Sequence, residues 1–365
     1  MLIGIDASRT AKHFKTGTET YSTELIKSLS KIDRQNGYIL YSPRPIEEKL
    51  PGLPSNFRYK ILPFGKFWTQ IRLSWEFMTH KNPDILFVPA HTLPLIYPKK
   101  TVVTLHDLGF KHFPELYTPT DILYHNWAMN HSIKHSSHII AISEFTKKDI
   151  LANYTIDPAK ISVIYEGYNE EEFKPVKSKK PGLPYILFIG RLEEKKNIVG
   201  MIRAYWILRQ EKNIRHQFIL AGNPGFGSEK IKAEIEKLPK EVKNDIILPG
   251  YVSQERYIEL LKNADILFFC SFFEGFGLPP LEAMACGVPV VASNRTSIPE
   301  VTGKAALLVD PKKPFEMAVA LSKIINDTAT RNALISKGLT RATLFSWKKT
   351  AEKTLALLEI VYNKK

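Results

Sequence analysis

The chain has 365 residues, of which 44% are hydrophobic and 24% charged. This composition excludes disordered and fibrous proteins and suits a globular protein of two domains. The formal net charge at pH 7 is +14, with 20 basic and 18 acidic side chains in residues 1–173 and 31 and 19 in residues 174–365. The basic second half favours a nucleotide phosphate, an anionic membrane or nucleic acid as partner, and a merely solubilising surface is the alternative.

The two cysteines, Cys270 and Cys286, sit in apolar segments without a His or Cys at ligand spacing. We therefore expect buried, reduced thiols and a reducing compartment. The N-terminus begins with a strand pattern rather than a signal peptide, and no apolar run approaches the roughly 20 residues that span a bilayer. These features predict a cytoplasmic protein, and the basic charge leaves open peripheral contact at the inner face of the membrane.

Short apolar runs alternate with helical patterns along the whole chain. In the first half they cover residues 2–8, 38–42, 59–63, 84–90, 101–107, 138–143 and 161–167; in the second, residues 185–190, 217–222, 245–250, 264–271, 289–293 and 305–310. Continuous apolar strands separated by helices indicate parallel sheets covered on both faces. The sequence therefore predicts two doubly wound, Rossmann-like α/β domains, whose ligands bind at the carboxyl ends of the strands and in the cleft between the domains.

The first strand leads into a loop with Gly17, followed by a helix with Tyr21, Leu25, Ile26 and Leu29 on its apolar face. Further on, the aromatic segment 64–78 has the pattern of an amphipathic helix. A membrane-surface helix is one interpretation, but we expect a helix that packs on the core.

A later strand, 101–105, ends in His106 and Asp107. A His at a strand end that faces the other domain is a candidate site residue. The alternatives are a structural histidine and an aspartate that caps the next loop.

Residues 167–184 are rich in charge, Pro and Gly and predict a hinge. We expect an N-terminal domain of residues 1–173 and a C-terminal domain of residues 174–345. Ser346 can cap a last helix, 346–365, with Leu355, Leu358, Ile360 and Val361 on its apolar face.

In the second half, a buried strand ends at Gly190 and is followed by Arg191 and Lys196. Two cations at the carboxyl end of a strand suit a diphosphate, where they would stabilise the charge of a departing nucleotide. We expect the neighbouring Lys195 to be solvated. The stretch GNPGFG, residues 222–227, lacks the glycine spacing of a dinucleotide loop and predicts a turn between a strand and a helix.

The most informative stretch, residues 271–293, reads SFFEGFGLPPLEAMACGVPVVAS. Glu274 follows a strand, and Glu282 lies eight residues later in a short helix. Gly275 and Gly277 allow a ligand to approach the backbone closely. A carboxylate at such a loop can accept two hydrogen bonds from sugar hydroxyls, whereas the alternative is a solvated loop charge and a helix N-terminal residue.

The two glutamates in this setting resemble the signature of the retaining glycosyltransferases of family 4, which have the GT-B fold. The GR-x4-K element at Arg191 and Lys196 resembles the same family. The resemblance implies that Glu274 binds donor-sugar hydroxyls and Glu282 the ribose. It also implies that the amides of Phe276, Gly277 and Leu278 face sugar and phosphate.

The resemblance extends to the first half, where it implies that His106 lies near the reacting carbon of the donor sugar. It also implies that the loop at Gly17 closes over the diphosphate and the acceptor, although the usual double glycine is replaced by TGTET. The stretch TLHDLGFKHFPE is similar to bacterial mannosyltransferases. The last helix is expected to pack back on the N-terminal domain, which binds the acceptor, while the C-terminal domain binds the nucleotide sugar.

We therefore expect a retaining hexosyltransferase that uses GDP-mannose or a UDP-glucose type donor and a glycan or lipid-linked glycan acceptor. No D-x-D triplet occurs in the sequence, so we expect neither a metal nor a cofactor, and Arg191 and Lys196 would supply the positive charge. A nucleotide-sugar epimerase of similar architecture is the alternative. We expect no nucleic-acid partner, because no recognition motif accompanies the basic charge.

Overall fold

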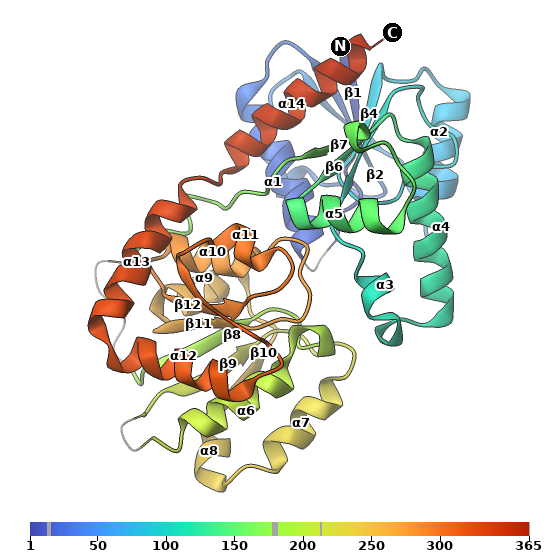
Figure 1. Cartoon of the computed structure of the whole chain (residues 1–365). Coiled ribbons are helices and arrows are strands. Elements are labelled where there is room, and N and C mark those ends of the chain that lie inside the picture. The colour runs from blue at the N-terminus through green and yellow to red at the C-terminus, as the bar shows by residue number, and fades with distance from the viewer. Residues whose placement is uncertain (13–15, 177–181, 212–213, 365) are drawn as a thin grey trace. The chain divides into compact units, whose positions relative to one another are not determined.

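The computed structural model describes residues 1–12, 16–176, 182–211 and 214–364. The chain forms two compact units (Figure 1). Unit 1 comprises Met1–His112, Tyr117–Gly167 and Ser346–Lys365, and unit 2 comprises Phe113–Leu116 and Tyr168–Phe345. The main change of unit therefore falls between Gly167 and Tyr168, whereas the sequence analysis placed it after residue 173.

Unit 1 is built on a parallel sheet of seven strands in the order β3-β2-β1-β4-β5-β6-β7. All of its strand pairs are parallel. The strands are β1 (Leu2–Asp6), β2 (Gly37–Ser42), β3 (Phe57–Ile61), β4 (Ile85–Val88), β5 (Thr101–Leu105), β6 (His138–Ala141) and β7 (Ile161–Val163).

The longer helices of unit 1 carry one buried face each, as expected for helices that cover a sheet. The helices are α1 (Gly17–Ile32), α2 (Ser74–Thr79), α3 (Gly109–His112), α4 (Pro119–His135), α5 (Glu144–Asn153) and α14 (Trp347–Asn363), with short helical turns η1 (Glu47–Lys49), η2 (Thr69–Leu73) and η4 (Pro158–Lys160). The predicted apolar face of α1 is confirmed, since Tyr21, Leu25, Ile26 and Leu29 are all fully buried.

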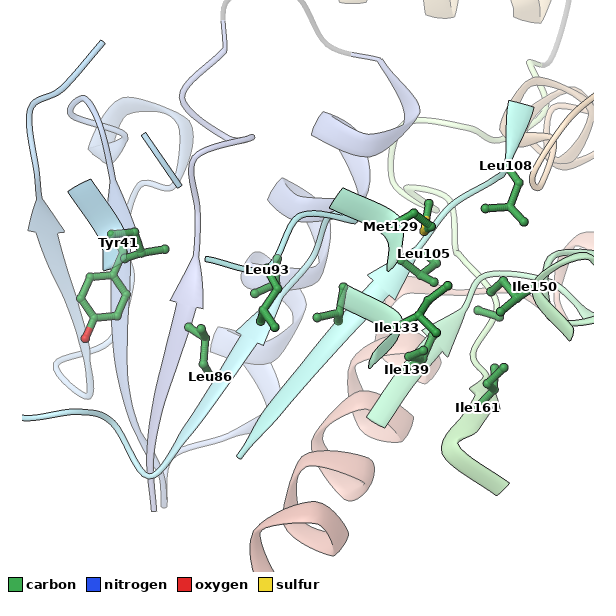
Figure 2. Close-up of a cluster of buried hydrophobic side chains, with 14 of the residues drawn as sticks. Tyr41, Leu86, Leu93, Leu105, Leu108, Met129, Ile133, Ile139, Ile150 and Ile161 are labelled. Atoms are coloured by element: carbon green, nitrogen blue, oxygen red, sulfur yellow. The ribbon is translucent and has the colours of Figure 1, made fainter. Parts of the chain in front are cut away.

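A hydrophobic cluster joins strands of unit 1 to the helices that pack on them (Figure 2). Leu105 of β5 and Ile139 of β6 meet Met129 and Ile133 of α4, and Ile150 of α5 belongs to the same cluster. Burying each such side chain contributes about 1.5–3 kcal/mol. This packing fixes the sheet, and with it the strand ends that carry His106.

Unit 2 contains a parallel sheet of six strands in the order β10-β9-β8-β11-β12-β13. The strands are β8 (Tyr185–Ile189), β9 (Gln217–Ala221), β10 (Ile246–Gly250), β11 (Ile266–Phe269), β12 (Val290–Ser293) and β13 (Ala306–Val309). Every strand that the sequence predicted is therefore present, and the expectation of two doubly wound sheets is confirmed.

The helices of unit 2 connect these strands. They are α6 (Ile198–Leu208), α7 (Ser228–Glu236), α8 (Lys240–Asn244), α9 (Gln254–Asn263), α10 (Leu278–Ala285), α11 (Ile298–Thr302), α12 (Pro314–Asn326) and α13 (Thr328–Ala342), with short turns η3 (Pro114–Leu116) and η5 (Glu194–Lys196). Helix α6 packs against α12, and α10 packs against α13. Cys270 and Cys286 are free and buried, as predicted.

The last helix, α14, belongs to unit 1 and packs against α1. Ser346 caps it by accepting a hydrogen bond from the Lys349 amide at 3.2 Å. The predicted apolar face was partly wrong. Leu358 and Val361 are buried, but Ile360 is 56% exposed, because the face that packs runs through Ala351 and Thr354 instead.

The aromatic segment 64–78 forms one turn of π-helix, η2, continued by α2. Trp68, Leu73 and Phe77 are buried, which confirms a core-packing helix. The opposite side of the segment is also apolar and is exposed. None of the helices among the described residues combines the length and hydropathy of a membrane-spanning segment.

The backbone at Gly167 is in close contact with the backbone at the start of α14. A Cβ atom added to it would lie 2.1 Å from the Trp347 amide nitrogen and 2.3 Å from the Ser346 carbonyl carbon. Both are backbone atoms at the start of α14, so no side-chain rotation can relieve the overlap. Only glycine allows α14 to pack here.

We expect Gly167→Ala to lower the free energy of unfolding by about 3 kcal/mol, because α14 must shift away from unit 1. Urea denaturation followed by circular dichroism measures this change. Gly65→Ala is the matched control, since a Cβ atom there meets no atom within 4 Å, and it should change stability by no more than about 0.5 kcal/mol. Equal stability of the two variants would contradict the close packing at Gly167.

Candidate functional site

The order of strands in unit 2 brings two predicted motifs together. From β8 the chain runs outward to β9 and β10, then returns to place β11 on the other side of β8. Strands β8 and β11 are therefore neighbours at which the direction of winding reverses. Ligands of open parallel sheets bind at the carboxyl ends of such strands. Arg191 follows β8 and Glu274 follows β11, so the predicted residues stand at this switch point.

Glycines shape the turn after β8. Gly190 and Gly222 both have positive φ, 147° and 148°, and a Cβ atom on Gly222 would lie 1.9 Å from the Gly190 carbonyl oxygen. The turn at residues 222–227 is bonded to the segment after Arg191, since the Gly225 amide donates to Leu192 at 2.8 Å and the Glu194 amide to Phe226 at 3.0 Å. The glycine-rich turn after β9 therefore supports the loop that carries Arg191.

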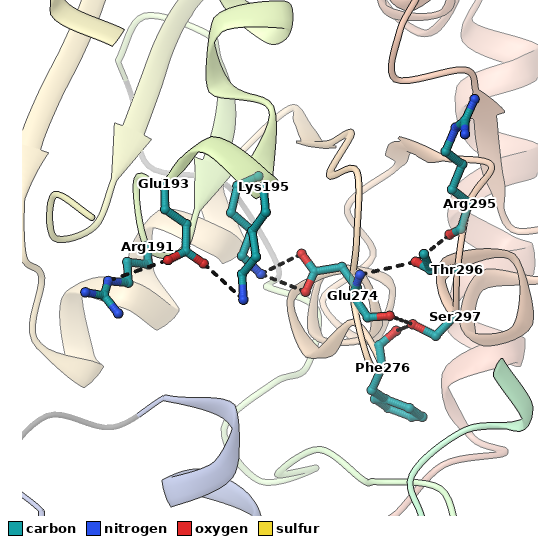
Figure 3. Close-up of polar contacts among 9 residues, drawn as sticks. Arg191, Glu193, Lys195, Glu274, Phe276, Arg295, Thr296 and Ser297 are labelled. Carbon is teal, nitrogen blue, oxygen red and sulfur yellow. Dashed lines mark hydrogen bonds and ion pairs between the residues drawn. The ribbon is translucent and has the colours of Figure 1, made fainter. Parts of the chain in front are cut away.

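The central contact of the site is an ion pair between the two motifs (Figure 3). Lys196 Nζ lies 2.7 Å from both carboxylate oxygens of Glu274. The side chains of Lys196 and Glu274 are 16% and 12% exposed, so water screens the pair only in part. The predicted cation and the predicted carboxylate are thus bound to each other.

A second acidic side chain, Glu193, lies between two cations of the same turn (Figure 3). Its carboxylate is 3.7 Å from Arg191 Nε and 3.4 Å from Lys195 Nζ. Arg191 keeps a side chain that is 62% exposed. Lys195, which we expected to be solvated, is only 19% exposed, because it packs against Glu193.

The loop that carries Glu274 is fixed by the segment after β12. Ser297 Oγ donates to the carbonyl oxygen of Glu274 at 2.9 Å or of Phe276 at 2.7 Å. The Glu274 amide donates to Thr296 Oγ1 at 3.2 Å. Ser297 is fully buried. These bonds hold the backbone of the loop, and nothing in the sequence motif indicated Thr296 or Ser297.

Helix α10 begins directly after this loop. Gly277 precedes it with φ 118°, and a Cβ atom there would lie 2.7 Å from Ile298 Cδ1. The first amides of an α-helix have no carbonyl partner within the helix and carry its positive dipole end. The amides of Gly277 and Leu278 are thus suited to an anion, and the glycine is required by its conformation.

Glu282 lies on α10 and is buried, with its carboxylate accepting a hydrogen bond from the Tyr257 hydroxyl of α9. Burial and the neighbouring Glu282 raise the pKa of Tyr257 well above its usual value, so the phenol stays protonated and can donate. The ring of Tyr257 packs edge-on against Phe173 at 6.0 Å. The sequence analysis missed Tyr257, because Tyr257 lies on α9, before the motif of residues 271–293, and reaches Glu282 only through the packing of α9 beside α10.

His106 lies in unit 1, at the end of β5, and is buried together with Glu166. Its Nε2–H donates to the Pro89 carbonyl oxygen at 2.9 Å, and Nδ1 is 3.4 Å from a Glu166 carboxylate oxygen. Tyr21 packs edge-on against the imidazole at 5.0 Å. Burial raises the pKa of Glu166, and the contact with His106 opposes that shift in part. Both ring nitrogens therefore have protein partners.

Two further residues named in the sequence analysis lie in unit 1. Asp107 accepts a hydrogen bond from the Gly109 amide at 2.7 Å and so caps the following turn, which was the alternative to a site role. Gly17 begins α1, directly after Thr16, which forms a capping box with Glu19. A Cβ atom on Gly17 would meet nothing within 4 Å. Residues 13–15 of the predicted glycine loop lie outside the described residues.

Among the residues that the structure describes, no group of three or more His, Cys, Asp or Glu side chains could hold a metal ion. The turn after β8 carries three basic side chains, Arg191, Lys195 and Lys196, each ion-paired with a glutamate.

Two family models match the chain. One described as "Glycosyl transferases group 1" matches residues 169–341, and one described as "Glycosyltransferase Family 4" matches residues 15–172. Among curated proteins, the chain is 29% identical to O-antigen chain mannosyltransferase B of Escherichia coli, over 96% of this chain and 98% of that protein. It is 27% identical to O-antigen chain mannosyltransferase RfbU of Salmonella typhimurium, over 73% and 71%.

Solved structures resemble the chain over its full length. The crystal structure of Anabaena HepE with UDP and glucose has a TM-score of 0.75 at 18% identity, covering 98% of this chain and 99% of that one. The structure of WaaG, a glycosyltransferase of lipopolysaccharide biosynthesis, has a TM-score of 0.74 at 13% identity, covering 100% of both. At these identities the likeness establishes the fold, and the expectation of two Rossmann-like domains of the GT-B type is confirmed.

The buried pair of Glu166 and His106 predicts a pH dependence of stability. A carboxyl whose pKa is raised on folding stabilises the native state fully below its unfolded value, about 4.3, and loses that contribution as pH rises through the folded value. We expect the wild type to lose stability relative to Glu166→Gln as pH rises above about 4.3, by at most about 1.4 kcal/mol per pH unit. Urea denaturation of both proteins across this range measures the difference. A constant difference, or one that changes in favour of the wild type, would contradict the environment described for Glu166.

Proposed function

Because the chain belongs to glycosyltransferase family 4, we propose that it transfers a hexose from a nucleoside-diphosphate sugar to a hydroxyl acceptor with retention of configuration. The observation that carries this proposal is the ion pair of Lys196 and Glu274 at the switch point of unit 2. It places a cation suited to a phosphate beside a carboxylate suited to sugar hydroxyls, which are the two halves of a nucleotide-sugar donor.

In the proposed complex, the departing diphosphate binds Arg191, Lys196 and the amides of Gly277 and Leu278. As the bond between the sugar and the phosphate breaks, negative charge accumulates on the diphosphate. Fixed cations and amides stabilise that charge without reorganising, which is the largest contribution that such sites make to catalysis. Arg191 has the most exposed side chain of this set, which allows it to reach a ligand.

Glu274 is proposed to accept hydrogen bonds from the hydroxyls of the donor sugar. Lys196 already holds its two oxygens in a fixed direction. Each carboxylate oxygen can accept more than one hydrogen bond, so binding of a sugar does not require the ion pair to break. Gly190, Gly275 and Phe276 complete the proposed surface around the donor.

Glu282 is proposed to bind the ribose hydroxyls, with Tyr257 as a positioning residue. The Tyr257 hydroxyl donates to one Glu282 oxygen, which fixes the carboxylate plane before the ligand arrives. A preoriented carboxylate binds a pair of hydroxyls with a smaller entropic cost than a mobile one.

His106 and Gly17 are proposed to act from the N-terminal domain, His106 near the reacting carbon of the sugar. Since Nε2 and Nδ1 of His106 both have protein partners, the ring is held in one orientation by Pro89 and Glu166. We assign the acceptor site to the N-terminal domain and the donor site to the C-terminal domain, as in the family. The chemistry needs no metal or cofactor in this proposal.

GDP-mannose is the preferred donor of the proposal, because the relatives named above are mannosyltransferases. A UDP-glucose type donor is the second candidate, since HepE was solved with UDP and glucose. The acceptor is proposed to be a glycan or lipid-linked glycan, in the cytoplasm with peripheral contact at the membrane. The epimerase alternative is not supported, because both family models describe glycosyl transfer.

The proposal is tested by incubating the protein with labelled GDP-mannose or UDP-glucose in EDTA and following nucleotide release and labelled product. We expect one donor to be consumed with an α-linked product and no interconverted sugar nucleotide. Arg191→Ala should lower kcat about a hundredfold, because it removes a charge that the transition state needs.

The matched control for Arg191→Ala is Arg203→Ala, which removes another partly exposed arginine of unit 2, paired with Glu234 at 2.6 Å. It should leave kcat unchanged. Sugar interconversion without transfer, or equal kcat values for the two variants, would contradict the proposal.

A second test separates the ribose site from the reacting centre. Glu282→Ala should raise the donor KM about a hundredfold with little change in kcat, since two hydrogen bonds to a carboxylate are lost. Tyr257→Phe should raise the donor KM by a smaller factor, because the carboxylate remains but is no longer held. Steady-state kinetics at varied donor concentration measures both. A donor KM that is unchanged in Glu282→Ala would remove Glu282 from the nucleotide site.

A further inference from the structure

Unfavourable backbone conformations occur on both sides of the ion pair between Lys196 and Glu274. Among the residues that the structure describes, three other than glycine have positive φ: Phe67 at 59°, Asn197 at 58° and Thr296 at 58°. Asparagine tolerates this left-handed conformation better than most residues, whereas a β-branched threonine takes it only at a cost. Such conformations persist where surrounding contacts enforce them, and they are common at functional sites. Asn197 follows Lys196 directly, and Thr296 is bonded to Glu274.

The side chain of Asn197 is buried and joins three strand ends of unit 2. It is 5% exposed. Its Nδ2 group donates to the Cys270 carbonyl oxygen, directly after β11, at 3.1 Å and to the Pro311 carbonyl oxygen, after β13, at 2.7 Å. Gly200 of α6 leaves room for this side chain, since a Cβ atom there would lie 2.3 Å from Asn197 Oδ1. One amide group therefore ties the turn after β8 to the segments after β11 and β13.

A backbone bond on the other side of Lys196 acts in the same direction as Asn197. The Phe272 amide donates to the Lys195 carbonyl oxygen at 2.9 Å. Lys196 therefore stands between two residues that are both bonded to the segment after β11, and this segment leads directly to Glu274. The backbone of the cation is thus held against the chain that carries its partner.

Thr296 holds the other half of the ion pair (Figure 3). Its Oγ1 accepts a hydrogen bond from the Glu274 amide at 3.2 Å and donates to the Arg295 carbonyl oxygen at 2.8 Å. The hydroxyl meets the Glu274 amide while Thr296 has a φ of 58°. The unfavourable conformation of a β-branched residue therefore coincides with a bond to the loop that carries the carboxylate.

We propose that Asn197 and Thr296 are positioning residues that orient Lys196 and Glu274 toward the donor. The inference rests on the proposed function, in which Lys196 binds the diphosphate and Glu274 binds hydroxyls of the sugar. Each positioning residue acts through its neighbour and not by touching the reacting atoms. An electrostatic mechanism requires groups that are oriented before the reaction begins, and this requirement gives a physical reason for keeping two costly conformations at one site.

The first experiment measures how firmly Lys196 is held, and it needs no substrate. The rate at which acetic anhydride acylates Lys196 is followed by mass spectrometry in the wild type, Asn197→Gly and Thr296→Gly. Glycine keeps the left-handed backbone without strain, so each variant loses only the contacts of the side chain. We expect acylation of Lys196 to be at least about fivefold faster in both variants, because the loss of one or two hydrogen bonds frees the ammonium from its ion pair more often.

Lys147 of unit 1 is the internal reference, since its Nζ donates to the Ile161 carbonyl oxygen at 2.9 Å. Its acylation rate should not change. The matched control is Phe67→Gly, which replaces the third residue of positive φ, in unit 1, and should leave Lys196 labelled as in the wild type. Unchanged labelling of Lys196 in both test variants would overturn the proposal. So would an equal acceleration at Lys147, because it would indicate a general loosening of the fold.

Transfer kinetics of the same proteins test whether this orientation matters for the reaction. Asn197→Gly and Thr296→Gly should each lower kcat about tenfold, as expected for the loss of a hydrogen bond that orients a charged group. Thr296→Ser should restore kcat, because it keeps the hydroxyl group that accepts from the Glu274 amide. Phe67→Gly should have the kcat of the wild type.

A double-mutant cycle shows whether Asn197 acts through Lys196. In a Lys196→Met background, Asn197→Gly should lower kcat by less than about twofold, since residues that act as one unit are not additive. A further tenfold loss in that background, or a kcat of Thr296→Ser as low as that of Thr296→Gly, would overturn the proposal. A wild type that transfers no sugar while the labelling of Lys196 changes as expected would contradict the proposed function alone.

Discussion

The ion pair between Lys196 and Glu274 is the contact on which the rest of the site depends. It links the turn after β8 to the loop after β11, two segments nearly eighty residues apart in the sequence. A partly buried carboxylate would be costly without a partner, and a partly buried ammonium likewise. Each charge therefore keeps the other in place, and together they bring to the carboxyl edge of the sheet a cation suited to a phosphate and a carboxylate suited to sugar hydroxyls.

The surrounding structure keeps the carboxyl edge of the unit 2 sheet in a fixed arrangement. The winding of the sheet makes β8 and β11 neighbours, so the loops that follow these two strands leave the sheet at the same edge. Glycines at positions 190, 222 and 277 adopt conformations with positive φ that other residues rarely take. Ser297 fixes the backbone of the Glu274 loop from a third strand end. Rigid support of this kind is what an electrostatic mechanism requires, because its groups must be oriented before the reaction begins.

The fold could be predicted from the sequence because its strands are continuous apolar runs whose lengths and spacing leave few alternatives. The positions of Gly277 at the start of α10 and of Glu282 within it could also be predicted, because both belong to one short sequence motif. Ser297, Tyr257 and Glu166 could not, because each reaches its partner only through tertiary packing, and a single serine, tyrosine or glutamate has no recognisable spacing. Ile360 was wrongly assigned to the buried face of α14, because an apolar residue on a helix need not face the core.

The central claim is that the carboxyl edge of the unit 2 sheet binds a nucleoside diphosphate through the chain's own charges. Isothermal calorimetry with GDP and UDP in EDTA tests it most directly, on the wild type and on Lys196→Met. The account predicts that one of the two nucleotides binds without metal and that the substitution weakens its binding at least about tenfold, because a charge-assisted contact is lost. Binding that requires added Mg²⁺ or Mn²⁺, or that is unaffected by the loss of Lys196, would contradict it.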